Sequence, residues 1–186
     1  VSEMNYDLPT SVEIGGESYA VRSDYRAILD ICAAMSDVEL NTQEKAIVTL
    51  SIFYPDLETI PSEGMREALE RCFWFINCGG QPENRQQPKL LDWEQDFPYI
   101  IAPINRVLGQ EIRSVPYLHW WTFISAYYEI GDCTFAQIVS IRDKKARGKK
   151  LEKAEAEWYK KNQNLVDFRK VYSDTEKDFL KQWGAG

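Results

Sequence analysis

Hydrophobic and polar residues alternate in two short runs near the N-terminus, Ser11–Ile14 and Glu17–Val21. A period of two is typical of a β-strand, and the Gly15-Gly16 pair between the runs suits the positive φ angles of a tight turn. The pattern therefore predicts a small β-hairpin.

After the hairpin, the apolar positions recur every three or four residues, which is the period of a helix. Three helices are predicted before residue 80, and each has a polar residue that can cap its start: Ser23, Thr42 and Ser62. The Gly79-Gly80 pair supplies a left-handed stop for the third helix. Residues 79–91 are then polar, contain prolines and lack a period, so we expect an exposed loop and an internal boundary there.

Three further helices are predicted between residues 92 and 141. Asp92 and Gln95 have the spacing of a capping box, and Pro103 should bend the helix that follows. The next helix, Tyr117–Glu129, has almost no polar face and should lie at the centre of the fold. Thr134 opens the last of the three. The expected core centres on Trp120, Trp121, Phe123, Phe73 and Ile100.

The C-terminal part has its own apolar stripe. From Leu151 the apolar positions follow a 3-4 spacing, which predicts a long amphipathic helix that Asn162–Asn164 could interrupt. The stripe must be buried either against the parent domain or against another chain, and the sequence leaves both open.

Basic and acidic residues are unevenly distributed along the chain. The net charge is −7, which disfavours a general binder of nucleic acid or anionic membranes. Residues 1–141 contain 9 basic and 21 acidic side chains, whereas 142–186 contain 13 basic and 8 acidic ones. We therefore expect a globular, mainly helical domain over 1–141 and a basic, amphipathic helical segment over 142–186.

The segment 142–161 contains nine basic residues, with Trp158 and Tyr159 among them, a composition that could suit nucleic-acid phosphates and bases. Four acidic residues dilute this charge and favour a solvated helical face or a protein partner. The predicted partner-binding residues are Leu151, Trp158, Leu165, Phe168, Lys144, Lys145, Lys149 and Lys150.

No catalytic or metal-binding constellation can be assembled from the sequence. His119 is the single histidine and lies in the most apolar predicted helix, so we expect a hydrogen-bonded core residue. The four cysteines form no C-x-x-C pair and should be free thiols in a reducing cytosol. Nucleotide-binding and hydrolase glycine motifs are absent, and so is an apolar run long enough to span a membrane. We expect neither an enzyme nor a cofactor.

Several strings resemble the bacteriophage gene-product-fifteen family, small proteins of tailed phages and prophages of Gram-positive bacteria. The most specific are Tyr117–Phe123, Cys133–Phe135 and Ile138–Arg142; Asp92–Leu108 and Leu8–Tyr25 also fit. The resemblance implies a tail assembly chaperone that coats the tape-measure protein in the host cytoplasm before tail-tube subunits polymerise around it. It implies no catalytic residues and no cofactor.

The sequence and the resemblance together predict a mainly α protein with an N-terminal β-hairpin that acts in phage tail assembly. We expect several copies to bind the tape-measure protein, with the tail-tube protein as a further partner. Two alternatives remain: a structural tail or connector component of the virion, and a nucleic-acid-binding accessory protein acting through 142–161.

Overall fold

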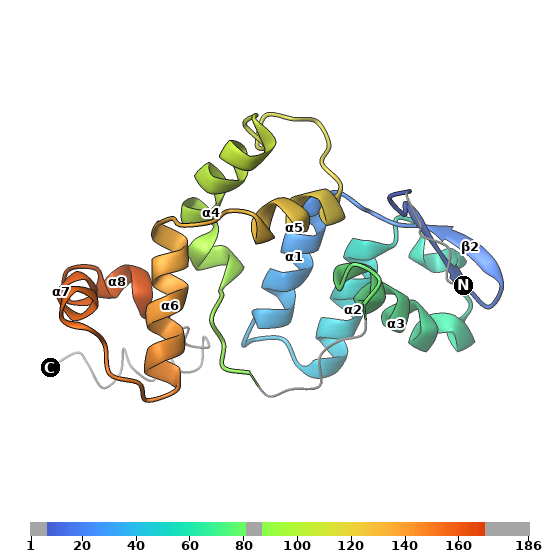
Figure 1. Cartoon of the computed structure of the whole chain (residues 1–186). Coiled ribbons are helices and arrows are strands. Elements are labelled where there is room, and N and C mark those ends of the chain that lie inside the picture. The colour runs from blue at the N-terminus through green and yellow to red at the C-terminus, as the bar shows by residue number, and fades with distance from the viewer. Residues whose placement is uncertain (1–6, 81–86, 170–186) are drawn as a thin grey trace, which may run out of the picture. The chain divides into compact units, whose positions relative to one another are not determined.

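A computed structural model describes residues 7–80 and 87–169 of the chain. Within these ranges the fold is mainly α with one two-stranded sheet, which confirms the predicted class (Figure 1). None of the described helices is both long and apolar enough to cross a membrane. The elements are β1 (Ser11–Ile14), β2 (Glu17–Ala20), α1 (Tyr25–Ser36), α2 (Thr42–Phe53), η1 (Leu57–Thr59), η2 (Ser62–Gly64), α3 (Met65–Ile76), α4 (Trp93–Leu108), α5 (Trp120–Tyr128), α6 (Thr134–Ala146), α7 (Lys153–Lys161) and α8 (Gln163–Val166).

The chain forms two compact units that interleave in sequence. The first contains the described part of Val1–Asn84 together with Val115–Ser125, and the second contains that of Arg85–Ser114 with Ala126–Gly186. This division differs from the predicted one after residue 141, because α6 and α8 pack with each other and α6 packs with α4. The basic segment is therefore part of the second unit.

The first unit contains the predicted hairpin. β1 and β2 pair antiparallel with Val12 opposite Tyr19, as the alternating pattern predicts. The helices also form, but none of the three predicted caps is used. Ser62 begins the short helix η2, and α3 follows Gly64 without a side-chain cap. Asp24, not Ser23, caps α1: its side chain accepts the Arg26 amide at 3.0 Å, while the Ser23 hydroxyl is hydrogen-bonded to Tyr117 Oη at 2.7 Å. Asn41, one residue before Thr42, caps α2 and forms a capping box with Glu44.

Helix α5 begins at Trp120, three residues later than predicted. The preceding backbone is held in an extended bridge, in which Asp24 pairs with His119. The amide of Leu118 donates to the Asp24 carboxylate at 2.9 Å, and the Leu118 carbonyl accepts from the amide of Tyr25 at 2.9 Å. Backbone that is extended in this bridge cannot also be helical, so the helix starts after it.

The predicted core is partly correct. Trp120 and Phe123 are buried in the first unit, where the Phe123 ring stacks on Tyr25 with centroids 4.8 Å apart. Trp121 is only partly buried, and so is Phe73; Phe75 is fully buried instead, because the inner face of α3 carries Ala68, Cys72 and Phe75. Ile100 is fully buried in the core of the second unit.

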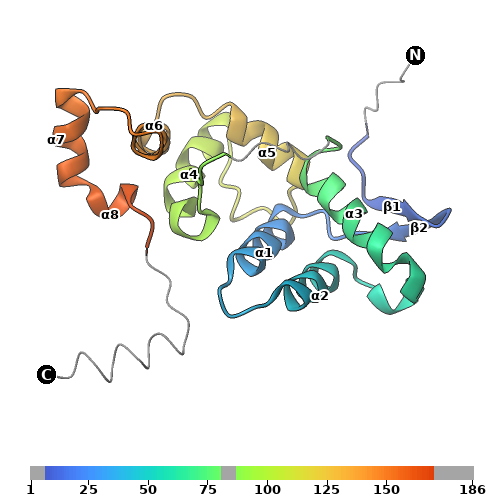
Figure 2. The ribbon, with the colours of Figure 1, turned by 90° about the horizontal axis from the view of Figure 1, so that it is seen from below.

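In the second unit, Asp92 caps α4 as predicted, and the helix continues from Trp93 through Pro103 to Leu108. The Asp92 side chain accepts from the Gln95 amide, but the reciprocal bond to the Asp92 amide comes from Asp96 at 2.9 Å, not from Gln95. The predicted long C-terminal helix is divided into α7 and the single turn α8, which lie beside α6 (Figure 2). The division falls at Asn162, and Phe168 lies beyond α8.

Candidate partner-binding site

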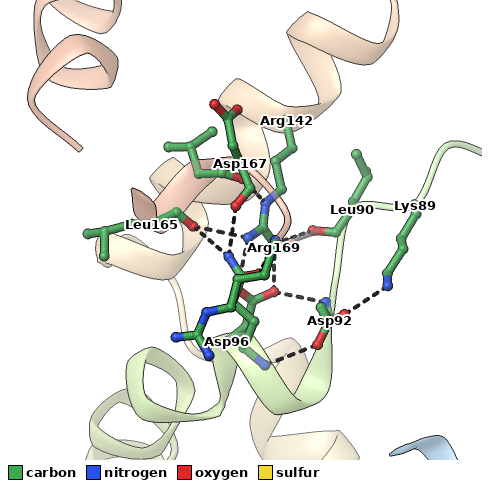
Figure 3. A network of polar contacts seen from close by, with 10 residues as sticks. Lys89, Leu90, Asp92, Asp96, Arg142, Leu165, Asp167 and Arg169 are labelled. Atoms are coloured by element: carbon green, nitrogen blue, oxygen red, sulfur yellow. Dashed lines mark hydrogen bonds and ion pairs between the residues drawn. The ribbon is translucent and has the colours of Figure 1, made fainter. Parts of the chain in front are cut away.

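A buried arginine organises the part of the second unit where the sequence predicts partner binding. Arg142 lies near the end of α6, and its side chain is 4% exposed. All five N–H groups of its guanidinium donate hydrogen bonds (Figure 3). The acceptors are Val166 O at 2.6 Å, Leu90 O at 3.0 Å, Asp96 Oδ2 at 2.6 Å, Asp96 Oδ1 at 2.9 Å and Leu165 O at 3.1 Å.

The carboxylate of Asp96 neutralises this guanidinium. Its side chain is fully buried in the first turn of α4, where the helix dipole favours a negative charge. Besides the two bonds from Arg142, Oδ2 of Asp96 accepts the backbone amide of Asp92. Both members of the buried pair are thus fully hydrogen-bonded, which is the condition under which such a pair is tolerated.

The arginine also anchors the chain beyond α8. The carbonyls of Leu165 and Val166 belong to the last helical turn and so lack partners within the helix. Arg142 supplies the missing donors, and the Phe168 ring stacks on its guanidinium with Cζ 4.1 Å from the ring centroid. Lys89 Nζ lies 5.0 Å from the same centroid. The predicted partner-binding residue Phe168 therefore makes its aromatic contacts within its own unit.

The amide side chain of Gln95 completes this anchor. Its Nε2 donates to the carbonyl of Asp167 at 3.0 Å, and its Oε1 accepts the amide of Arg169 at 2.9 Å. Gln95 thus bonds alternate backbone groups of an extended segment, as a neighbouring β-strand would. We call Gln95, Asp96 and Arg142 the polar clamp; it holds residues 165–169.

The apolar stripe packs on the same unit. Val166 forms a buried cluster with Ile138 and Ile141 of α6, and three predicted partner-binding residues, Leu151, Trp158 and Leu165, pack against this cluster while partly buried. Of the two arrangements that the sequence left open, the structure has burial against the chain's own unit.

The four candidate lysines divide into two pairs. Lys144 forms an ion pair with Glu155, whose hydrogen bond raises the pKa of the lysine. Lys145 bonds Asp167 and Tyr159; although burial alone would raise the pKa of Asp167, these hydrogen bonds lower it. Lys149 and Lys150 are exposed and make no ion pair within the described ranges. They are the candidates that remain available to a partner.

The single histidine is a buried residue with both ring nitrogens hydrogen-bonded, as predicted. His119 is 3% exposed, its Nδ1 accepts the amide of Trp121 at 3.0 Å, and its Nε2 donates to Pro9 O at 2.9 Å. The four cysteines are free thiols. Residues 7–80 and 87–169 contain no cluster of three or more His, Cys, Asp or Glu residues that could hold a metal ion.

Comparison with known protein families identifies the family of this chain. The family model described as bacteriophage Gp15 protein matches residues 4–168, most of the chain. The chain belongs to the bacteriophage Gp15 family. The polar clamp and its contact with Phe168 lie within the matched range of this Gp15 protein. Neither the curated proteins nor the solved structures contain a significant match.

Sequence reasoning did not find the polar clamp. Arg142 is the first residue of the basic run 142–161, for which the sequence predicts a solvated face or a protein partner, and Gln95 is predicted only as part of a capping box. The one available signal was the position of Arg142 directly after Ile138 and Ile141, on a helix whose inner face is apolar. A cation next to such a face needs a buried partner.

Proposed function

We propose that this Gp15-family protein is a non-enzymatic tail assembly chaperone. It binds the tape-measure protein in the host cytoplasm before tail-tube subunits polymerise around that chain, and it leaves as the tube forms. A tape-measure protein is a long, partly apolar helical chain that would aggregate unprotected, so its partner needs exposed apolar contacts that are reversible.

Exposed apolar side chains on helices are the observation that carries this proposal. Ile47 on α2 is 62% exposed, and Tyr128 at the end of α5 is 75% exposed. Because the apolar stripe of the C-terminal segment is used within its own unit, these helical side chains replace the stripe as the apolar contacts to the tape-measure protein. Ile47 belongs to the first unit and Tyr128 to the second.

Basic residues of α7 support the contact. Lys153, Lys160 and Lys161 are exposed and have no ion pair among the described residues. The polar clamp and the Lys144–Glu155 pair hold this helix in place, so its lysines form a preorganised surface. Such a surface suits acidic positions on a helical partner.

The same contacts count against a nucleic-acid-binding role. Four of the nine basic residues in 142–161 are engaged inside the unit: Arg142, Lys144, Lys145 and Arg147. The remaining lysines alternate with Glu152 and Glu157, which reduce the attraction for phosphates. A protein partner is therefore favoured.

The occupied histidine supports a role without catalysis. Both ring nitrogens of His119 are engaged by backbone groups, so neither is available to a substrate as general acid or base. Binding, not bond making, is the activity that these residues can support.

Co-expression with the tape-measure protein of the same phage tests the proposal. We expect the tape-measure protein to be soluble and to co-purify only when this chain is present, and an Ile47→Asp variant to reduce the yield of the complex. Gln43→Asp, an exposed change on the same helix, is the matched control. If the tape-measure protein is equally soluble and unbound with and without this chain, the proposal is wrong.

A further inference from the structure

The two units carry opposite net charges. Residues 1–84 and 115–125 contain 5 basic and 15 acidic side chains, a net of −10. Residues 85–114 and 126–186 contain 17 basic and 14 acidic side chains, a net of +3. Each chain therefore carries both partners of an electrostatic contact with another copy of itself.

The negative partner is the connection between α1 and α2. Helix α1 has no basic residue in its last turn, so its own side chains do not offset the partial negative charge of its C-terminus. Asp37 and Glu39 follow directly and are exposed. Between these acids Val38 is 50% exposed, and Met35 before them is 39% exposed. This surface, residues 35–39, combines negative charge with exposed apolar side chains.

The positive partner is the turn between α6 and α7. Lys149 and Lys150 follow Gly148, whose φ of +64° reverses the chain at the end of α6. Arg147 is paired with Asp143, and Lys144 pairs with Glu155 across the turn. These contacts and the polar clamp hold the turn in place. Lys149 and Lys150 themselves form no ion pair with an acidic residue in the described part of the chain.

We propose that the Lys149–Lys150 turn of one copy binds the 35–39 surface of a second copy. The ammonium groups are attracted to the negative charge of this surface, and the aliphatic stems of the lysines cover Met35 and Val38. A second copy is the favoured occupant because its complementary surface is on the same chain.

This contact is heterologous, since it joins different surfaces of the two copies. Each copy in such a pair keeps one unused surface, to which a further copy can bind in the same way. The inference does not depend on the proposed function, because it concerns association of this chain alone.

Sedimentation equilibrium of the full chain, with and without nuclease treatment, tests it. Salt shortens the screening length from about 10 Å at 0.1 M to about 3 Å at 1 M. We expect a mass well above one chain at the lower salt and the mass of one chain at the higher salt. A single-chain mass at the lower salt overturns the proposal, and so does association that salt leaves unchanged or that nuclease treatment abolishes.

Charge-reversed variants locate the contact. We expect K149E/K150E and D37K/E39K each to weaken self-association by about tenfold or more, and an equimolar mixture of the two to recover it, because the mixture retains one pair of native surfaces. K45E/R66E changes the net charge as much as K149E/K150E and should not weaken association. Circular dichroism checks that each variant is folded. Equal weakening by the control, or no recovery on mixing folded variants, overturns the proposal.

Discussion

Arg142 and Asp96 form a bidentate ion pair inside the second unit, with N–O distances of 2.6 and 2.9 Å. Their side chains are 4% and 0% exposed. The pair joins α4 to α6, and the remaining N–H groups of the arginine hold the carbonyls of Leu90, Leu165 and Val166. One buried charge pair thus connects the C-terminal segment to the rest of its unit.

Breaking this pair should be costly. In Asp96→Asn the guanidinium of Arg142 stays buried without its counter-charge, so we expect the free energy of unfolding to fall by about 3–5 kcal/mol. Chemical denaturation monitored by circular dichroism measures the change. Arg113→Met removes an exposed, solvent-screened pair with Glu111 and should lower stability far less. Equal, small losses in both variants would contradict the importance of the buried pair.

The Gln95 side chain should protect the backbone that it bonds. In Gln95→Ala the amide of Arg169 loses its acceptor and the carbonyl of Asp167 loses a donor. We expect hydrogen exchange of the Arg169 amide to accelerate by about tenfold, the equivalent of one net hydrogen bond. Hydrogen exchange followed by NMR measures this rate. Gln43→Ala, on an exposed side chain of α2, should leave the rate unchanged, whereas equal rates in all three proteins would show that Gln95 does not hold the segment.

A surface ion pair makes stability depend on pH. The hydrogen bonds from the side chain and the backbone of Arg113 lower the pKa of Glu111 from 4.5 to about 2. Because the folded-state pKa is depressed, this contribution to stability is present above pH 4.5 and is lost as the pH falls towards 2. In Arg113→Gln we expect the pKa of Glu111 to move up towards 4.5, as an NMR titration of its carboxyl carbon can measure. A pKa that is the same in both proteins would contradict this explanation.

Burial should protect two thiols of the first unit, those of Cys32 and Cys72, from alkylation. Burial raises the pKa of Cys72 to about 12 and that of Cys32 to about 11. Since the thiolate is the reactive form, iodoacetamide at pH 8 should alkylate both slowly in the native protein and rapidly in denaturant. Mass spectrometry of peptides reads the two sites separately. Rapid native labelling of Cys72, which is 0% exposed, would show that the core of this unit is wrongly assigned.

The sequence predicts local structure well where a local signal sets it. The period-two run of the hairpin and the helical period of α3 depend on near neighbours, and both elements form, although α3 begins at Met65 and buries Phe75 in place of Phe73. The start of α5 depends instead on Asp24, more than ninety residues away, which pairs with the backbone at Leu118 and His119. A periodicity cannot reveal such a distant bridge.

For the candidate site, the sequence predicts which residues take part but not how they pack. The stripe of Leu151, Trp158 and Leu165 was identified, but its burial against Ile138 and Ile141 depends on tertiary packing. Arg142 and Asp96 are 46 residues apart, and neither differs locally from a solvated charge or a helix-start acid. The number of charged residues in a segment does not show which of them form ion pairs with distant residues.

Quantitative mass spectrometry of tail assembly intermediates and finished particles tests the proposed chaperone role most directly. The chain should be recovered on the tape-measure protein before the tail tube has formed, in several copies, and should be missing from purified mature tails. Retention in mature tails at the same copy number would make it a structural component of the virion. Failure to find it on the tape-measure protein at any stage would contradict the account.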